Sequence, residues 1–324
     1  MAVYTHLSSE ALADLIAHYD VGEVVSAKGI AEGVSNSNWL VETTGGTEGG
    51  TRFILTMYER RIDIAELPFF LGLLDHLSEH GAPVPRTIHD RSGAASRTIM
   101  GKAVALIEFL PGVSVDEPTA AQARSVGKVL AQMHALAQDF SGQRANDLGP
   151  DVSAAVLAEC GADALAQIDP ALPAVIAVAG DIASRWPTDL PQSVIHSDLF
   201  PDNVLMLGDK VSALIDFYFA CNDAMAYDLA VTHAAWSFAD HGRTYRPEVG
   251  QALLQGYESV RQLLPAERES LSLLAQGAAL RFVSSRAQDW IDTPADALVT
   301  RKDPMDFVRR LDFYRENGAQ VFGS

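Results

Sequence analysis

The sequence predicts an α+β protein of two lobes, with a strand-rich N-terminal lobe and a larger, mostly helical C-terminal lobe. In the first third of the chain, short apolar runs alternate with turn residues, whereas from residue 119 onward apolar residues recur at helical spacing. The 324 residues contain no internal repeat and no low-complexity tract. We therefore place the lobes at residues 1–107 and 113–324, joined by the Pro-Gly turn region at 108–112.

The N-terminal lobe begins with an amphipathic helix capped at Ser8 or Ser9, with Leu12, Leu15 and Ile16 on one face. A second helix is expected from Leu67 to His80, because Gly81 and two prolines prevent its continuation. The remaining apolar runs predict strands at 23–31, 38–43, 52–58 and 103–107.

The C-terminal lobe is predicted to be helical apart from one interruption. Three apolar runs, at 193–195, 204–207 and 211–215, are short and bounded by turn residues, which favours strands. Helical periodicity covers 119–138, 151–167, 171–185, 225–238, 245–263, 265–291 and 304–316.

The charge balance and the cysteines restrict the partners and the compartment. The net charge is −18 and no basic run occurs, which argues against nucleic acid or an anionic membrane as a partner. Cys160 and Cys221 are too few for a disulfide framework or a zinc site, so a reducing compartment is expected. The first residues lack a secretory signal and no apolar run is long enough to span a membrane. We therefore expect a cytoplasmic protein.

The most informative stretch is the polar loop between the first two short strands of the C-terminal lobe. His196, Asp198 and Asn203 have the His-x-Asp-x-x-x-x-Asn spacing of a kinase catalytic loop, and Asp216 follows the next strand. We expect Asp198, Asn203 and Asp216 to emerge at one end of a small hairpin. Such oxygen ligands suit phosphoryl transfer with Mg²⁺, in which Asp198 accepts the hydroxyl proton while Asn203 and Asp216 hold the metal.

Three other interpretations of this stretch remain open. A hairpin with capping carboxylates does not explain a polar, proline-bearing loop between two buried strands. A metal-dependent phosphohydrolase would need further His or Asp ligands, and none is spaced nearby. A catalytically inactive nucleotide-binding protein is the third interpretation, and the presence of Asp198, Asn203 and Asp216 argues against it.

These residues resemble the protein-kinase-like phosphotransferases of small molecules, the group that contains aminoglycoside, choline and homoserine kinases. Ser197 and Tyr218 differ from the Arg and Gly of protein kinases proper. The resemblance implies a protein-kinase-like two-lobe fold, a hinge at 108–112 and ATP as co-substrate, with His196 and Asp228 supporting the catalytic loop. The turn that contains Gly33, Ser35, Asn36, Ser37 and Asn38 is rich in small side chains, so its backbone N–H groups could approach nucleotide phosphates; an ordinary hairpin turn is the alternative. The resemblance adds nucleotide contacts at Thr56, Glu108 and Leu110.

Within that group the chain looks most like bacterial homoserine kinases of the aminoglycoside-phosphotransferase-like type. The similar segments are 29–38, 67–70, 215–221 and 280–286. Thr56 stands where most kinases have a phosphate-binding Lys, a substitution that also occurs in this branch. The resemblance implies that L-homoserine is the acceptor. The alternative is a related enzyme that acts on an aminoglycoside, choline or methylthioribose.

The acceptor site is expected to hold both charges of an amino acid. A desolvated carboxylate needs a cationic or N–H partner, and Arg281, Ser285 and Asp289 recur on one helical surface with Arg286 beside them. A surface ladder of ion pairs is the alternative explanation of this spacing. We list Tyr218, Asp223, Trp236, Arg281 and Arg286 as candidate acceptor-binding residues, and the sequence leaves the oligomeric state open.

Overall fold

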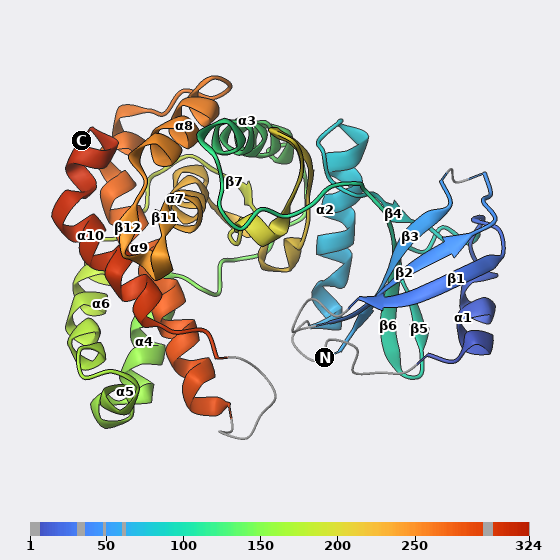
Figure 1. The fold of residues 1–324 in the computed structure, drawn as a ribbon, viewed down its shortest axis with the longest axis horizontal. Coiled ribbons are helices and arrows are strands. Elements are labelled where there is room, and N and C mark those ends of the chain that lie inside the picture. The colour runs from blue at the N-terminus through green and yellow to red at the C-terminus, as the bar shows by residue number, and fades with distance from the viewer. Residues whose placement is uncertain (1–6, 31–35, 48–49, 60–62, 294–300, 324) are drawn as a thin grey trace. The chain divides into compact units, whose positions relative to one another are not determined.

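The structure, a computed structural model, describes residues 7–30, 36–47, 50–59, 63–293 and 301–323. Its contacts divide the chain into two compact units. The first comprises residues 1–112, 140–142 and 212–218, and the second comprises residues 113–139, 143–211 and 219–324. The predicted α+β class is confirmed, because an antiparallel sheet forms the first unit and helices dominate the second (Figure 1). The role of 108–112 as a hinge stays a prediction.

The first unit is built on a six-stranded antiparallel sheet in the order β1-β2-β3-β6-β4, with β5 paired to β6. In β2, buried and partly exposed side chains alternate from Trp39 onward, as expected for a strand with one face on the core. The strands are β1 (Val24–Ile30), β2 (Asn36–Thr43), β3 (Arg52–Tyr58), β4 (Thr87–Ile88), β5 (Arg97–Ile99) and β6 (Lys102–Glu108).

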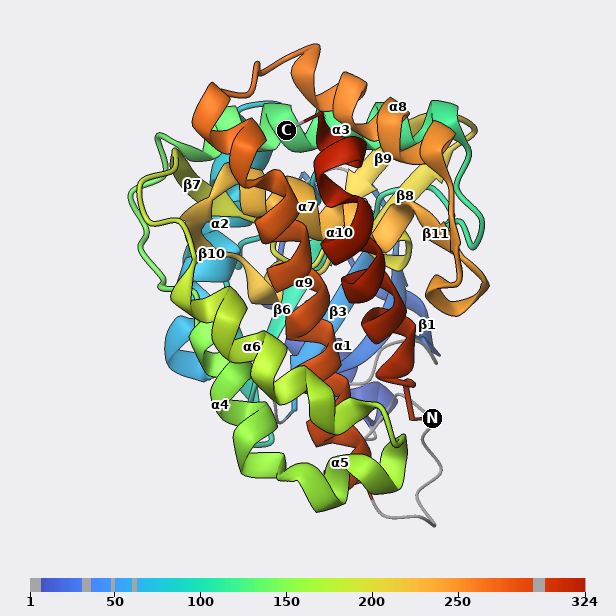
Figure 2. The ribbon, with the colours of Figure 1, turned by 90° about the vertical axis from the view of Figure 1, so that its left-hand side faces the viewer.

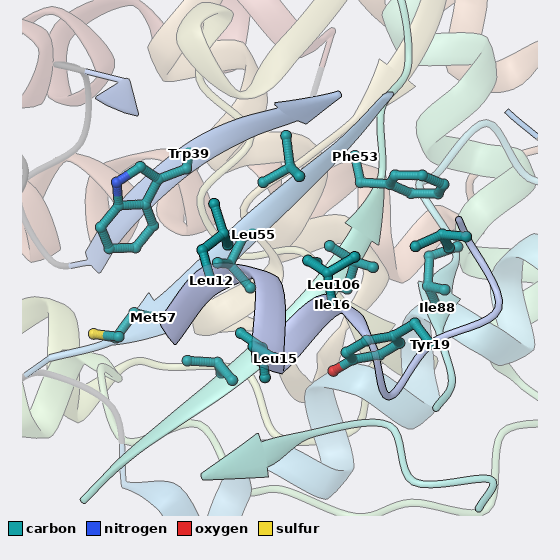
Figure 3. Packing of buried hydrophobic residues seen from close by; sticks show 13 residues of the cluster. Leu12, Leu15, Ile16, Tyr19, Trp39, Phe53, Leu55, Met57, Ile88 and Leu106 are labelled. Atoms are coloured by element: carbon teal, nitrogen blue, oxygen red, sulfur yellow. The ribbon is translucent and has the colours of Figure 1, made fainter. Parts of the chain in front are cut away.

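One face of this sheet is covered by α1 (Ser9–Ile16), whose first turn is capped by the Ser8 hydroxyl. Figure 3 shows Leu12, Leu15 and Ile16 packed against Leu55 and Leu106 of the sheet. Each buried side chain of this size contributes about 1.5–3 kcal/mol to folding. The predicted apolar face of this helix is therefore confirmed.

A second core cluster of the first unit lies along α2 (Leu67–Glu79). Leu67 and Leu71 pack with Tyr58 of β3, Ala105 of β6 and the ring of Tyr218. The short segment Ile64–Glu66 leads into this helix as a 3-10 turn capped by Asp63. The helix thus brings the end of strand β3 and the segment after Asp216 into one apolar cluster.

The second unit is a helical assembly around a buried central helix, α7 (Met225–Trp236). Every residue of α7 is buried, which is typical of a helix in the interior of a large core. The long helix α9 (Pro265–Asp292) packs against α7 and α10 (Met305–Phe322), and also against α4 (Pro150–Cys160) and α6 (Val175–Ser184) (Figure 2).

Helices α3 (Ala120–Ala137) and α8 (Pro247–Glu258) of the second unit pack closely against each other. A Cβ atom on Gly127 would overlap the carbonyl oxygen of Leu253, and one on Gly256 would overlap that of Arg124. The backbones approach closely because both positions are glycine. None of the described helices has the length and apolarity needed to cross a membrane.

Short strands surround the polar loop of the second unit. Strand β7 (Gln192–Ile195) precedes the loop and pairs with β10 (Cys221–Ala224), a strand that the sequence pattern did not predict. The loop ends in the 3-10 turn Pro201–Asn203, and β8 (Val204–Leu207) then pairs with β9 (Lys210–Leu214). A small hairpin of β11 (Phe238–Ala239) and β12 (Thr244–Tyr245) encloses the turn Asp240–Gly242.

Four predicted helices differ from the observed ones. Helix α8 ends at Glu258 and not at 263, and α10 continues to Phe322 and not to 316. The segment predicted at 151–167 is two helices, α4 and α5 (Ala162–Ile168), because Gly161 has a φ of +77° that ends the first helix. The segment predicted at 171–185 starts as a 3-10 turn, Leu172–Ala174, and becomes α-helical only at Val175. In this turn Pro173 lacks the N–H that a helix interior uses.

Candidate active site

The polar loop that follows β7 carries a strained residue next to the candidate catalytic aspartate. Ser197 has a φ of +67°, a region that non-glycine residues seldom adopt. Such strain persists only where surrounding contacts fix the backbone, and it is concentrated at functional sites. The next residue, Asp198, is partly buried, whereas His196 and Ser197 are buried.

Asp228, near the start of α7, binds the backbone of the loop. Its carboxylate accepts hydrogen bonds from the backbone N–H of His196 and of Ser197, both at 2.7 Å. His134 Nε2 of α3 lies 2.9 Å from the same carboxylate. Burial alone would raise the pKa of Asp228, but these hydrogen bonds and the neighbouring imidazoles outweigh it, so the pKa is lowered. The loop backbone is therefore tied to an ionised, buried carboxylate.

Two further side chains hold the loop from α9 and α7. The guanidinium of Arg281 donates to the backbone oxygen of Ser197 and, at 2.8 Å, to its Oγ. Its Nη2 lies 3.7 Å from Asp198 Oδ1. The indole N–H of Trp236 donates to the backbone oxygen of Leu199 at 2.9 Å. Contacts from α7 and α9 thus support the unusual backbone of Ser197.

Asp198 and Asn203 are brought together within this loop. The side-chain amide of Asn203 donates to the backbone oxygen of Asp198 at 2.8 Å and to its Oδ2 at 3.3 Å. Burial raises the pKa of Asp198, and the nearby charges of Arg281 and His196 partly oppose this effect. Because the nitrogen of Asn203 faces Asp198, the amide oxygen is the atom suited to a hard cation such as Mg²⁺.

Asp216 belongs to the first unit and lies at a second strained position. Its φ is +65° and its side chain is exposed. Tyr218 follows two residues later, and its hydroxyl lies 3.1 Å from that of Tyr58. Its ring packs edge-on against Tyr58 and Phe70, with burial raising its pKa well above the ordinary value. The expected convergence of Asp216 with Asp198 and Asn203 stays a prediction.

The candidate nucleotide contacts of the first unit are only partly within the described residues. Gly33 and Ser35 lie outside them. Asn36 and Ser37 are buried at the start of β2, and Asn38 accepts a hydrogen bond at 2.8 Å from Thr56 Oγ1 on the paired strand. Thr56 therefore supplies a buried hydroxyl bonded to its neighbouring strand.

The hinge candidates lie at the end of β6. The backbone N–H of Glu108 donates to the oxygen of Arg86 at 3.0 Å, and its carboxylate lies 4.0 Å from the Arg86 guanidinium. Leu110 is half-buried and lies two residues after the end of the strand.

The remaining acceptor candidates of the second unit are all engaged with protein groups. Asp223 of β10 accepts a hydrogen bond at 2.6 Å from the side-chain amide of Asn146. Arg286 donates to the backbone oxygen of Asp303 at 2.9 Å and to Asp306 Oδ2 at 3.1 Å. Trp236 is fully buried. Their assignment to the acceptor stays a prediction.

One charged residue near Asp198 was not identified from the sequence. Lys302 is exposed and lies close enough for its charge to lower the pKa of Asp198. No periodic pattern or motif surrounds it, so nothing in the sequence indicated its proximity. Among the described residues no group of three His, Cys, Asp or Glu side chains is placed to hold a metal. A site for Mg²⁺ here would use an amide oxygen and water beside one or two carboxylates, as Mg²⁺ sites commonly do.

Comparison with known proteins shows the family of the chain. Residues 26–263 match the model of the phosphotransferase enzyme family. The homoserine kinase of Gluconacetobacter diazotrophicus is 49% identical over 318 residues, with 97% of each chain covered. The homoserine kinase of Caulobacter sp. is 48% identical, with 100% of this chain and 99% of the relative covered.

The fold is shared with solved small-molecule kinases of low sequence identity. An amicoumacin kinase in complex with AMP-PNP, Ca²⁺ and Ami superposes with a TM-score of 0.67 at 14% identity, covering 98% of this chain and 94% of that one. A spectinomycin phosphotransferase in complex with ADP and spectinomycin gives a TM-score of 0.66 at 14% identity, covering 99% of both chains. The family predicted from the sequence is confirmed: the chain belongs to the phosphotransferase enzyme family and, within it, to the homoserine kinases.

Proposed function

We propose that this chain transfers the γ-phosphoryl group of ATP to the hydroxyl of L-homoserine, a step of threonine biosynthesis. The observation that carries the proposal is the near-half identity to homoserine kinases over almost the whole chain. The loop geometry is compatible with it, because Asp198 and Asn203 are adjacent and held from α3, α7 and α9. Catalysis of phosphoryl transfer consists mostly of such positioning and of charge stabilisation.

In the proposed reaction, Asp198 accepts the proton of the homoserine hydroxyl as the hydroxyl oxygen bonds to the γ-phosphorus. The bond from that phosphorus to the bridging oxygen of ADP breaks, and ADP leaves with the electron pair. The raised pKa of Asp198, which burial causes, makes this carboxylate a better proton acceptor than an exposed one. Arg281 keeps the carboxylate next to a positive charge.

Mg²⁺ would be held by Asn203 and Asp216, and the oxygen donors of these residues suit that ion. When bound, it would neutralise the charge of the triphosphate oxygens. His196 and Asp228 fix the backbone that carries Asp198. We assign ATP contacts to Gly33, Ser35, Asn36, Ser37, Asn38 and Thr56, and to Glu108 and Leu110 at the hinge.

An acceptor screen with Mg·ATP tests the proposal directly. We expect kcat/KM for L-homoserine to exceed that for choline, kanamycin and methylthioribose by several orders of magnitude, measured by coupled ADP release. A preference for one of the other alcohols would leave a kinase with a different acceptor. Absence of turnover with every alcohol would remove the kinase proposal itself.

Replacement of Asp216 by alanine is expected to weaken binding of Mg·ATP by about 10-fold or more, because one oxygen ligand of the cation is lost. Titration calorimetry of Mg·ATP against the variant gives the affinity. Asp209→Ala, an exposed carboxylate in the β8–β9 turn, is the matched control and should bind Mg·ATP normally. Equal affinities of wild type and Asp216→Ala would exclude Asp216 as a ligand.

A further inference from the structure

Arg310 on α10 is a buried cation without a hydrogen-bond partner among the described residues. Its side chain is 9% exposed, and its Nε is buried and makes no hydrogen bond. No carboxylate of the described chain lies within ion-pair distance of its guanidinium. Burial lowers its pKa to about 10, so it remains charged at neutral pH. A buried unpaired charge is costly, and proteins normally neutralise it with an anion.

The surroundings of Arg310 are aromatic. Its Cζ lies 4.1 Å from the ring centroid of Phe307 and 5.5 Å from that of Phe238. Gly242, with a φ of +80°, packs against the aliphatic part of the Arg310 side chain, since a Cβ there would lie 3.3 Å from Arg310 Cγ. Ring faces stabilise a guanidinium, but they satisfy none of its five N–H donors. The two rings therefore contact the guanidinium without occupying its N–H donors.

The local charge balance also favours an anion. Asp306 of α10 is the carboxylate whose charge acts on Arg310, and it already pairs with Arg286 at 3.1 Å and with Arg309 at 3.4 Å. Arg286 further lowers the pKa of Arg310 by repulsion. Two arginines thus already share this carboxylate, in a protein whose net charge is −18.

Arg310 is connected to the catalytic loop through the aromatic ring of Phe307. Phe307, which it covers, packs at 6.0 Å against Phe200 and at 4.7 Å against Phe282. Phe200 follows Asp198 by two residues. Arg286, whose charge also acts on Arg310, interacts electrostatically with Asp198, which places Arg286 near the loop.

We propose that Arg310 binds the α-carboxylate of the amino-acid acceptor and so selects acceptors that carry one. This inference rests on the proposed function and names the group that would recognise the carboxylate. Of the arginines near the loop, Arg281 is bonded to Ser197 and Arg286 to Asp306, whereas Arg310 has no such partner. A planar guanidinium pairs two of its N–H groups with a carboxylate, which suits a fork held between rings.

The test compares two acceptors that differ only in the carboxylate. L-homoserine and 3-amino-1-propanol share the amine, the chain and the hydroxyl. We expect Arg310→Met to lower kcat/KM for L-homoserine by about 10- to 100-fold, the usual effect of losing a charged hydrogen-bonded pair. The value for 3-amino-1-propanol and the KM for ATP should stay within about twofold.

Arg309→Met is the matched control, because Arg309 is the neighbouring arginine and is more exposed. It should change both acceptors little. Methionine preserves apolar contact with Phe307, and thermal melting checks that the variant folds. If Arg310→Met does not fold, Arg310→Lys replaces it, with a smaller loss confined to L-homoserine.

Equal losses for both acceptors would show a structural role of Arg310 and overturn the inference. No loss for either acceptor would also overturn it. A carboxylate site separate from the acceptor would appear as a non-competitive effect of L-alanine on 3-amino-1-propanol turnover that Arg310→Met abolishes, and this too would overturn the assignment. Failure of the wild type to phosphorylate L-homoserine would instead overturn the proposed function.

Discussion

Replacing Asp198 with asparagine is expected to lower kcat by about 10²- to 10⁴-fold, the usual contribution of a positioned proton acceptor. Asparagine keeps the size of the side chain, so the bond to Asn203 and the loop backbone should persist. The KM for ATP should therefore change little. Steady-state kinetics with saturating L-homoserine gives both values.

The control for this experiment is Asp202→Asn in the same loop. Asp202 is exposed, and its charge contributes to the raised pKa of Asp198. We expect the kcat of this variant to stay within a few-fold of wild type. Near-normal turnover by Asp198→Asn would remove the proton-accepting role from Asp198.

Asp228→Ala is expected to give the largest loss of stability, about 3–5 kcal/mol. The carboxylate is fully buried and accepts bonds from two backbone N–H groups and from His134. Removing it leaves these donors in the interior without an acceptor. Chemical denaturation monitored by circular dichroism gives the free energy of unfolding.

The effect of Asp228 should also depend on pH in a defined direction. Its pKa is lowered in the folded protein, so its stabilisation is present at neutral pH and declines as the pH falls below about 4. The difference between wild type and Asp228→Ala should shrink there. Asp181→Ala, which breaks an exposed pair with Arg185, should cost less than about 1 kcal/mol. A comparable cost for both variants would contradict the assigned importance of burial.

The sequence predicted those elements whose pattern is local. The apolar face of α1 and the ends of α2 and α9 follow from caps, glycines and periodicity, and the structure has them within a residue or two. Strand β10 was missed, because Cys-Asn-Asp-Ala has no apolar alternation and becomes a strand only by pairing with β7. The pairing partner of a short polar strand depends on the tertiary fold and cannot be read from the local sequence.

The motif of the candidate site was predictable from the sequence, but the residues that hold its loop in place were not. The spacing of Asp198 and Asn203 indicated a catalytic loop, and the structure places these residues in contact. Helical periodicity placed Arg281 on a surface with Ser285, whereas Arg281 is 4% exposed and bonded to Ser197. Periodicity identifies a helix face and not its partner. No sequence motif includes Arg310. It is unusual only because its buried Nε has no hydrogen-bond acceptor among the described residues, and this can be seen only in the structure.

The contact between Arg281 and Ser197 also bears on how the protein acquires activity during synthesis. Eighty-four positions separate the two residues, so the loop is made well before the helix that holds its strained backbone. The match to the family model ends at residue 263, before Arg281. A nascent chain or a fragment that stops there contains Asp198 but lacks the side chain that holds Ser197. The bonds from Arg281 to Ser197 can therefore form only after α9 has been translated, whereas Asp228 and Trp236 are already present in such a chain.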